Sequence, residues 1–561
     1  MSHTEPGAKK MREPLLQIRD LVVSFDTPNG PTEAVRKVSF DVAAGEILGI
    51  VGESGSGKSV TCRAILGLLP PTASVAGSVR FENRELVGLD ETALRAVRGK
   101  QVSMIFQNPA SHLDPLMKIG QQVSEPLIHH EGATPANART AAIESLREVK
   151  LDHAVQRADN YPHQLSGGMK QRAMIAAAVA CRPRLLLADE PTTALDVTVQ
   201  AHILDLLKEL NTSKNLSIVL VSHDLAVIAQ ICDRVVVMRN GEIVEQGNTR
   251  DIIDAPQHEY TRQLIDSQPG RLTDSTSGTG SPSSADAGNK TESEAAQPLL
   301  QIDQLRVEFD LPGSGIRFLP GNKEKRTLTA LDRVSIDLQQ GESLGIVGES
   351  GSGKSTVARV IMGLVSPAGG DVRLRGHSIL GARPDGQGDF RRSIQMAFQN
   401  PFDSLNPRFT VRDTIAEPLR KHRLVSKDKI DERVKELMRL VELDPQLAGR
   451  KSGQLSGGQC QRVGIARALA MNPEILIADE ITSALDVTIQ AQIIALLNRL
   501  RRKVGLTVIF ISHDLALVRT FCDRVAVFQA GKIVETGSVF QVLNQPRQDY
   551  TRALIASAPE L

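Results

Sequence analysis

Short, continuous apolar runs alternate along this chain with longer stretches that have helical periodicity. In the first half, residues 46–51, 185–188 and 218–221 are rich in Ile, Leu and Val, as strands buried on both faces are. Helical stretches lie between them. Because strands that alternate with helices form parallel sheets, the pattern predicts an α/β fold in which helices wrap a mainly parallel core sheet.

Two further patterns refine this fold. The pair Asn240-Gly241 and, less strongly, the pair Ala530-Gly531 are two-residue hairpin signals, which predict an antiparallel β part in each half. Between residues 107 and 166 the pattern turns helical, and we interpret this segment as a helical subdomain inserted into the core. The matching part of the second half carries an apolar stripe at Ile430, Val434, Leu437 and Val441.

One eight-residue stretch, GESGSGKS, occurs twice, each time between a predicted strand and a predicted helix. It fits the phosphate-loop pattern, in which backbone N–H groups surround phosphate oxygens, a lysine reaches the β- and γ-phosphates and a hydroxyl ligates Mg²⁺. One match arises by chance in roughly 2% of chains this long, and two make chance negligible. The predicted ATP-binding residues are Gly52, Glu53, Ser54, Gly55, Ser56, Gly57, Lys58 and Ser59, and Gly348, Glu349, Ser350, Gly351, Ser352, Gly353, Lys354 and Ser355.

The chain is an internal repeat. The offset between equivalent residues is 296 at Lys58 and Lys354 and 290 at Glu190 and Glu480, so insertions lie early in each half. We expect two domains, residues 1–267 and 299–561. A Ser-, Gly-, Thr- and Ala-rich segment without apolar periodicity, residues 268–298, is predicted to be a flexible linker.

Composition is that of an ordinary globular protein, with 41% hydrophobic and 23% charged residues in a chain of 561. Lysine plus arginine (66) and aspartate plus glutamate (65) nearly cancel, which gives no reason to expect a nucleic-acid partner. No signal peptide and no membrane-spanning run is apparent. The five cysteines form no CxxC pair, so we expect a reducing compartment and neither an iron–sulfur cluster nor zinc.

Two carboxylates follow a buried strand in each half, Asp189 with Glu190 and Asp479 with Glu480. In a phosphate-loop protein the aspartate holds the shell of Mg²⁺ and the glutamate polarises the water that attacks the γ-phosphate. A solvated strand end is the alternative for such a pair standing alone.

A Leu-Ser-Gly-Gly sequence lies in each half, with its serine 24 residues before the glutamate and a predicted helix (170–180 or 460–470) after it. Two glycines before a helix N-terminus make a second anion-binding surface, although Ser-Gly-Gly alone is often a linker. The residues are Ser166, Gly167, Gly168 and Met169, and Ser456, Gly457, Gly458 and Gln459.

A histidine and a glutamine complete each predicted site. His223 and His513 end strands 33 residues after each glutamate, where a neutral imidazole can bond the γ-phosphate. Gln107 and Gln399 lie in Phe-Gln-Asn-Pro, where the amide can ligand Mg²⁺ or its water. Taken singly, such histidines are more often core residues, and such glutamines turn residues.

The order of these motifs, with Asp196 and Asp486 in Ala-Leu-Asp, resembles the ATP-binding subunit of an ABC transporter, twice over. The resemblance implies that the halves pair head to tail, so that the Ser-Gly-Gly turn of one half completes the ATP site of the other. Both glutamates and both histidines are present, so we expect two hydrolytic sites. Family members stack adenine on an aromatic residue; Phe25 and Phe309 are the candidates, and simple packing in a strand is the alternative.

The segments LSGGMKQRAMIAAAV and LSGGQCQRVGIARAL, with HEYTRQLIDSQP and QDYTRALIASAP, resemble the two ATP-binding subunits of the dipeptide and oligopeptide import family, here fused. That resemblance implies two membrane permease subunits docked near residues 107–125 and 399–417, an extracytoplasmic solute-binding protein, and a peripheral location on the cytoplasmic face of the inner membrane. Peptides are the expected solute, with glutathione or nickel chelates as alternatives. The rival interpretation is a tandem ABC ATPase that acts on ribosomes. The predicted linker, which is poor in charged residues, counts against it. Met169 and Ile481 depart from the family's usual Gln and Pro.

Overall fold

The computed structural model describes residues 14–27, 30–193, 195–268, 297–310, 327–380, 390–400, 404–483 and 485–558. It divides into two compact units, one built mainly from residues 14–268 and the other mainly from residues 297–558. The predicted linker lies almost wholly outside the described residues, and the predicted domain boundaries stay a prediction.

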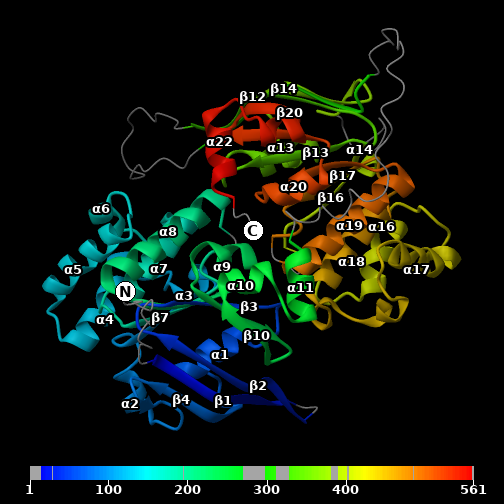
Figure 1. Ribbon diagram of the computed structural model, residues 1–561. Coiled ribbons are helices and arrows are strands. Elements are labelled where there is room, and N and C mark those ends of the chain that lie inside the picture. Colours follow the sequence, from blue (N-terminus) through cyan, green and yellow to red (C-terminus); the bar gives the residue numbers. More distant parts are fainter. Residues whose placement is uncertain are drawn as a thin grey trace, which may run out of the picture. The chain divides into compact units, whose positions relative to one another are not determined.

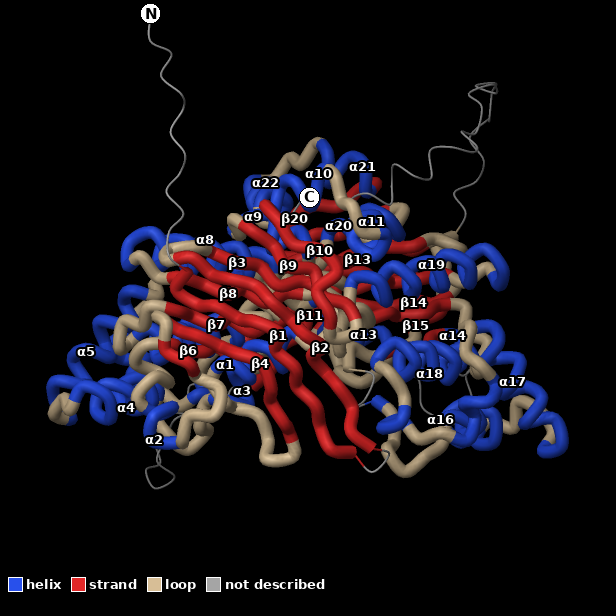
Figure 2. Tube along the Cα trace, turned by 60° about the horizontal axis from the view of Figure 1, so that its bottom comes forward, coloured by secondary structure: helices blue, strands red, loops and turns tan. Residues whose placement is uncertain are grey.

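The first unit is organised around a six-stranded sheet in which every neighbouring pair is parallel except β10 with β9. The strands, in spatial order, are β10 (Glu242–Asn248), β9 (Arg234–Arg239), β3 (Ile47–Val51), β8 (Ser217–Ser222), β7 (Leu185–Asp189) and β6 (Val102–Ile105). Figure 2 shows β3, β8, β7 and β6 as neighbouring strands. Every residue of β3, β6, β7 and β8 is buried. The continuous apolar runs of the sequence therefore do form strands covered on both faces, as predicted.

Alternate side chains of these strands enter two different apolar clusters, because successive residues of a strand point to opposite faces. Leu48 and Ile50 of β3 lie in a cluster with residues of the antiparallel sheet. Ile47 and Val51 lie in a cluster with residues of the helical insert. The core sheet thus separates the antiparallel part from the helical part.

The antiparallel sheet has the order β2-β1-β4-β5. Its strands are β1 (Pro14–Thr27), β2 (Gly30–Ala43), β4 (Ala73–Phe81) and β5 (Arg84–Glu85). A second antiparallel element is the β9–β10 hairpin, where Asn240 and Gly241 have φ of 49° and 85°. Two successive positive φ values are what a type I′ turn requires, and the predicted hairpin is confirmed. Its counterpart at Ala530 and Gly531 has φ of 47° and 79°.

The helices of the first unit include a contiguous insert between β6 and β7. In Figure 1, α4, α5 and α6 stand together beside α7, away from β1, β2 and β4. The Thr134 hydroxyl accepts a hydrogen bond from Asn137 N at the start of α5, so a local cap sets where this helix begins. The helices are α1 (Lys58–Ile65), α2 (Glu91–Arg95), α3 (Pro109–His112), α4 (Ile119–Glu131), α5 (Pro135–Glu148), α6 (Ala154–Ala158), η1 (Pro162–Gln164), α7 (Gly167–Val179), α8 (Val197–Lys214), α9 (Leu225–Ile231), α10 (Thr249–Asp254) and α11 (Glu259–Asp266).

The second unit repeats this plan. Its core sheet is β16 (Ile394–Ala397), β17 (Ile475–Asp479), β18 (Thr507–Ile511), β13 (Ser343–Gly348), β19 (Arg524–Gln529) and β20 (Lys532–Ser538), in spatial order. Its antiparallel sheet is β12 (Thr327–Leu338), β11 (Leu300–Asp310), β14 (Gly369–Leu374) and β15 (His377–Ser378). The helices are α13 (Lys354–Ile361), α14 (Phe390–Ser393), α16 (Val411–Lys421), η2 (Lys427–Lys429), α17 (Ile430–Leu440), η3 (Pro445–Gly449), η4 (Ser452–Gln454), α18 (Gly457–Leu469), α19 (Val487–Val504), α20 (Leu515–Phe521), α21 (Val539–Asn544) and α22 (Asp549–Ala556).

The predicted stripe of the second half lies on α17 and at its C-terminal cap. Ile430, Val434, Leu437 and Val441 are all buried in one cluster with residues of α16 and α18. Both units therefore have the predicted fold class, a mainly parallel core sheet with an antiparallel β part and an inserted helical subdomain. Among the helices that the structure describes, none combines the length and the apolar character needed to cross a membrane.

Candidate nucleotide-binding sites

The first phosphate loop joins β3 to α1, and its glycines are required by the backbone. Gly52 has a φ of 155°, and a Cβ atom there would lie 2.2 Å from the carbonyl oxygen of Met238. Gly57 has a φ of 98°, and its Cβ would lie 2.6 Å from the carbonyl oxygen of Ala34. Neither position has room for a side chain, so the neighbouring strands fix the curvature of the loop.

The second loop has the same geometry between β13 and α13. Gly348 has a φ of 143° with the Phe528 carbonyl oxygen 2.2 Å from a built Cβ, and Gly353 has a φ of 106°. In both loops the residues at the tip, Gly55 and Gly351, have no atom within 4 Å of a built Cβ. The loops are thus tightly packed at their bases and open at their tips, where a ligand has room.

The loop lysine is buried in each unit and is held by carbonyl groups of its own loop. Lys58 is 4% exposed, and its Nζ donates to the carbonyl oxygens of Gly52 at 2.6 Å and Glu53 at 2.8 Å. Lys354 is also 4% exposed and makes the same two bonds, to Gly348 at 2.7 Å and Glu349 at 2.8 Å. A buried ammonium group inside a ring of backbone groups is positioned to meet an anion.

A serine and an aspartate meet beside each loop lysine. The Ser59 hydroxyl donates to Asp189 Oδ1 at 2.7 Å, and the Ser355 hydroxyl donates to Asp479 Oδ1 at 3.1 Å. Burial, together with the charge of the adjacent glutamate, raises the pKa of each aspartate, and the serine bond offsets this only in part. Among the described residues, Asp189 Oδ2 is buried and has no hydrogen-bond partner. A hydroxyl beside an unsatisfied carboxylate oxygen fits a hard cation such as Mg²⁺, which needs few protein ligands when phosphates supply the others.

The glutamate after the aspartate is held in an unusual backbone conformation. Glu190 and Glu480 both have a φ of 48°, in the left-handed region that non-glycine residues seldom occupy. The Glu190 N–H donates to the Val221 carbonyl oxygen at 3.1 Å, and the Glu480 N–H donates to that of Ile511 at 2.9 Å. A bond to the neighbouring strand thus fixes the strained turn that points the carboxylate, and such strain gathers at functional sites.

The Glu190 carboxylate is the centre of a polar cluster. It accepts from Gln107 Nε2 at 2.7 Å and from the Thr193 hydroxyl at 2.9 Å, and His223 Nδ1 lies 3.4 Å away, all at Oε2. Burial alone would raise the pKa of Glu190, but the bond and charge of His223 and the Thr193 bond outweigh it and lower the pKa to about 2. This carboxylate therefore stays ionised at neutral pH, as a group that polarises water must.

The second unit has the corresponding cluster with one difference. Gln399 Nε2 donates to Glu480 Oε2 at 2.6 Å, and His513 Nδ1 lies 3.9 Å from Oε1. Ser483 stands where the first unit has Thr193, and its hydroxyl donates to the backbone carbonyl of Glu480 instead of the carboxylate. Burial would lower the pKa of His513, but the bond and charge of Glu480 outweigh it and raise that pKa. The pKa of Glu480 is lowered, because the same pairing outweighs its burial.

The Ser-Gly-Gly turns form helix starts. Ser166 and Ser456 are N-caps, and each hydroxyl accepts from the backbone N–H three residues later, at 3.3 Å. The helices begin at Gly167 and Gly457, three residues before the predicted starts, because these caps set the first turn. Gln459 also accepts from Ser456 N at 3.0 Å, which completes a capping box that Met169 cannot form.

The second glycine of each turn is also a packing residue. A Cβ on Gly168 would lie 2.5 Å from Val199 Cγ1, and a Cβ on Gly458 would lie 2.7 Å from Ile489 Cγ2. The close approach of this turn to the start of α8 or α19 is therefore one reason for glycine. Contact of the turns with ATP stays a prediction.

The two phenylalanine candidates for adenine stacking differ from each other. Phe25, in β1, is partly buried against the apolar cluster of the antiparallel sheet. Phe309, in β11, is 39% exposed. Packing against this cluster therefore buries part of the Phe25 side chain, and stacking of adenine on either ring stays a prediction.

A tyrosine from the end of each unit reaches the phosphate loop, and the sequence interpretation missed it. Tyr260 Oη accepts a hydrogen bond from Glu53 N at 3.1 Å, and Tyr550 Oη accepts from Glu349 N at 3.2 Å. The repeated Tyr-Thr-Arg triplet was a usable signal. Nothing in the local pattern said what the ring would contact, because the two partners are 207 and 201 residues apart.

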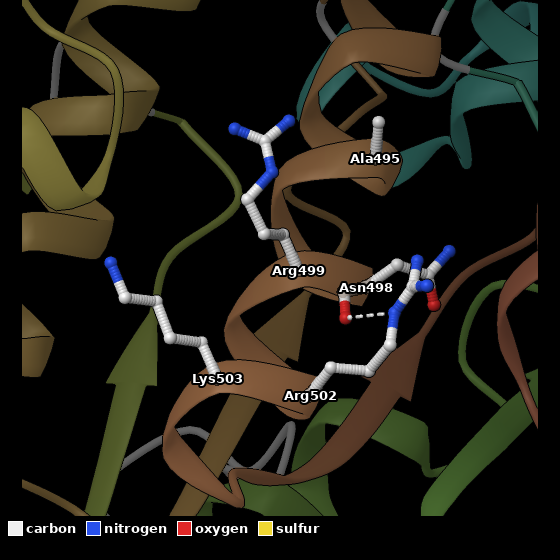
Figure 3. Close-up of a pocket in the computed structure, with 5 residues that line it drawn as sticks. All are labelled: Ala495, Asn498, Arg499, Arg502 and Lys503. Atoms are coloured by element: carbon white, nitrogen blue, oxygen red, sulfur yellow. Dashed lines mark hydrogen bonds between the residues drawn. The ribbon is translucent and has the colours of Figure 1, made fainter.

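Two other observations concern the rest of the described residues. In the part of the chain that the structure describes, no group of three or more His, Cys, Asp or Glu side chains could by itself hold a metal ion. Figure 3 shows a cavity on α19, and it shares no residue with the phosphate loops; its lining residues are Ala495, Asn498, Arg499, Arg502 and Lys503.

Comparison with known proteins agrees with this geometry. A family model described as "ABC transporter" matches residues 35–193 and 331–483, and a model described as "Oligopeptide/dipeptide transporter, C-terminal region" matches residues 244–287 and 534–561. The chain belongs to the ABC transporter family. It is an ATP-binding subunit with two fused nucleotide-binding domains, an ATPase of the kind that ABC import systems couple to transport through membrane permeases.

Curated relatives align over nearly the whole chain. The peptidoglycan transport ATP-binding protein YejF of Agrobacterium fabrum is 42% identical over 97% of this chain and 96% of its own length. The glutathione import ATP-binding protein GsiA is 41% identical in Pectobacterium atrosepticum, over 100% of this chain and 92% of the relative. In Escherichia coli K12 it is 42% identical, over 97% and 89%. Among solved structures, the dimeric cassette MJ0796 bound to ADP and Pi aligns with a TM-score of 0.39 and 32% identity, over 42% of this chain and 99% of that chain.

Proposed function

We propose that this protein is the ATP-hydrolysing subunit of an importer for short peptides and peptide-containing solutes. The observation that carries the proposal is that each unit assembles its own complete set of lysine, serine, aspartate, glutamate, glutamine and histidine around one phosphate loop. The match of both C-terminal segments to the oligopeptide/dipeptide transporter model supports the choice of solute class.

The residues would share the work in the first unit as follows. Lys58 and the loop N–H groups bind the β- and γ-phosphates of ATP, and Ser59 with Asp189 and Gln107 holds Mg²⁺ or its water. When bound, Mg²⁺ neutralises charge that develops on the phosphates. Glu190, kept ionised by its cluster, accepts a proton from the attacking water, and His223 donates a hydrogen bond toward the γ-phosphate.

In the second unit Lys354, Ser355, Asp479, Gln399, Glu480 and His513 would take the same roles. Both glutamates are present in equivalent clusters, so we propose that both sites hydrolyse ATP. As the family resemblance implies, we further propose that the halves pair head to tail during the cycle, so that Ser456–Gln459 completes the first site and Ser166–Met169 the second.

The cycle would act on a membrane complex. ATP binding closes the halves, hydrolysis reopens them, and two permease subunits alternate their access. A solute-binding protein on the far side would deliver the solute, and this chain would lie peripherally at the cytoplasmic face of the inner membrane. The ATPase does not touch the solute in this scheme, so solute identity rests on the relatives.

Among candidate solutes, the names of the relatives favour those that contain peptide bonds. Glutathione is a tripeptide and peptidoglycan carries short peptides, so both fit the proposed class as well as linear di- to hexapeptides do. Nickel chelates are less supported. The ribosomal alternative has no support among these relatives, whose names describe import or transport.

The test is uptake by vesicles that contain the assembled permease and this ATPase, with the solute-binding protein supplied on the outside. Labelled di- to hexapeptides or labelled glutathione are added outside the vesicles, and ATP is enclosed within them. The other solute and a nickel chelate serve as competitors. ATP-dependent uptake of peptide or glutathione supports the proposal. Uptake of the nickel chelate alone, or recovery of the chain with ribosomes instead of permeases, would contradict it.

A further inference from the structure

The C-terminal segment of each unit touches the phosphate loop through one tyrosine. Tyr260 of α11 and Tyr550 of α22 are two of only three tyrosines in the chain, and both make the same bond to the second residue of a loop. Tyr260 is 3% exposed, and Tyr550 is partly buried against the cluster of its own unit. A contact that recurs in both halves through such a rare residue calls for a reason beyond packing.

The contacted residue is held on both sides of its backbone. Glu53 donates its N–H to Tyr260 Oη at 3.1 Å, while its carbonyl oxygen accepts from Lys58 Nζ at 2.8 Å. Glu349 is held in the same way by Tyr550 and Lys354. The tyrosine therefore fixes the peptide group on which the buried lysine rests.

The tyrosine is in turn fixed by a carboxylate on the last strand of the core sheet. Glu245 of β10 accepts from the backbone N–H groups of Gln257 at 2.8 Å and His258 at 3.1 Å, in the turn that precedes α11. His258 Nδ1 accepts from Tyr260 N at 3.1 Å at the start of that helix. A short chain of contacts thus runs from β10 through this turn to the phosphate loop.

The second unit repeats this chain. Glu535 of β20 accepts from Arg547 N at 2.9 Å and from Gln548 N at 3.2 Å before α22 begins. Backbone hydrogen bonds help to lower the pKa of Glu245 and of Glu535 against the effect of their burial, so both carboxylates are charged at neutral pH. Charged acceptors make the stronger hydrogen bonds and hold the turn firmly.

The two residues that carry these contacts, Glu245 and Tyr260, lie within the segment 244–287, and their counterparts lie within 534–561. The oligopeptide/dipeptide transporter model matches these two segments, whereas the general ABC transporter model matches residues 35–193 and 331–483. The contact therefore joins a segment particular to this transporter group with the phosphate loop common to all of them.

We propose that Tyr260 and Tyr550 are positioning residues for ATP, through which the C-terminal segment of each unit senses whether its phosphate loop is loaded. This rests on the proposed function. When phosphate draws the Lys58 ammonium away from the Glu53 carbonyl, the peptide group shifts and the Tyr260 hydroxyl shifts with it. The reverse also holds, because coupling is reciprocal: a displaced α11 loosens the loop and weakens ATP binding.

The first test uses the small number of tyrosines. In the full chain labelled with 3-fluorotyrosine, ¹⁹F NMR gives three resonances, assigned with Tyr161→Phe, Tyr260→Phe and Tyr550→Phe. Adding Mg²⁺ and a non-hydrolysable ATP analogue is expected to shift the Tyr260 and Tyr550 resonances more than that of Tyr161. Tyr161 is the matched control because its ring stacks on His163, in a turn outside both loops.

The second test separates positioning from mere stability. Tyr260→Phe and Tyr550→Phe each remove one neutral hydrogen bond, so the KM for ATP at the affected site should rise about 2–10-fold, with kcat changed less than about twofold. Tyr161→Phe should leave both constants unchanged. Unmoved Tyr260 and Tyr550 resonances on saturation, or an unchanged KM in the double variant, would overturn the inference. Failure of the wild-type chain to bind the analogue would instead overturn the proposed function.

Discussion

The Thr193 hydroxyl donates a hydrogen bond to the Glu190 carboxylate at 2.9 Å. The serine at the equivalent position of the second unit turns its hydroxyl to the backbone carbonyl of Glu480. The two sites therefore hold the same carboxylate with different numbers of donors. A methyl and a hydroxyl on one Cβ restrict the threonine rotamer, which favours the carboxylate bond.

This difference predicts unequal sensitivity to loss of the hydroxyl. Thr193→Val should raise the pKa of Glu190 from about 2, because a donor to the ionised form is lost, and should lower hydrolysis at the first site by about 3–10-fold. The lowered pKa of Glu190 contributes folding stability at pH values above the pKa of the unfolded chain, and this contribution is lost as the pH falls toward the folded-state pKa. In the Thr193→Val variant Glu190 takes up its proton at a higher pH, so the acid-side decline of activity should also begin at a higher pH. The measurement is ATP hydrolysis against pH. Ser483→Ala is the control and should leave the profile unchanged; equal effects of the two variants would contradict the assignment.

Two hydrolytic sites predict additive losses from the two glutamates. Glu190→Gln and Glu480→Gln should each remove the proton acceptor of one site and slow that site by about 10²–10⁴-fold, with ATP still bound. Single-turnover hydrolysis of labelled ATP measures the fraction of sites that remain fast. Each single variant should retain about half of the fast amplitude and the double variant none. A single variant with full amplitude would show that its glutamate is not the general base.

The loop glycines predict a graded response to a methyl group. Gly52→Ala places a Cβ 2.2 Å from the Met238 carbonyl oxygen, so the loop must move, and ATP affinity should fall more than about tenfold. Gly55→Ala meets no atom within 4 Å and pays only for its φ of 82°, about 1–2 kcal/mol. Equilibrium binding of a fluorescent ATP analogue measures both. A larger loss of ATP affinity in Gly55→Ala than in Gly52→Ala would contradict this argument.

The unequal helix caps predict a stabilising substitution. Gln459 completes a capping box with Ser456, whereas Met169 offers Ser166 no acceptor. Met169→Gln should therefore stabilise the first unit by about 0.5–1 kcal/mol, or about 1–4 °C in Tm, and Gln459→Met should destabilise the second unit by the same amount. Calorimetry of the full chain resolves the two changes. Opposite shifts of equal size are expected, and shifts in the same direction would contradict the cap argument.

Much of the fold followed from local pattern. The runs at residues 46–51 and 185–188 form buried strands, and the Asn240-Gly241 pair forms its hairpin, because each depends on neighbours in sequence. The sequence pattern predicts the helix starts three residues late, because a Ser-Gly-Gly stretch is typical of a loop, whereas in the structure the Ser166 cap allows the first turn to begin at Gly167. The sequence offers Phe25 and Phe309 as equivalent candidates, yet the Phe25 side chain is partly buried and the Phe309 side chain is exposed.

The sequence by itself determined which chemical groups the protein carries, namely two phosphate loops and two aspartate–glutamate pairs, and that they are repeated. It could do so because these are short motifs whose residue types indicate their role. Only the tertiary structure decided which groups meet. Gln107 reaches Glu190 across 83 residues, and Tyr260 reaches Glu53 across 207. The physical reason is that a parallel sheet brings the carboxyl ends of strands far apart in sequence to one edge, and no local pattern records which loop each of them will face.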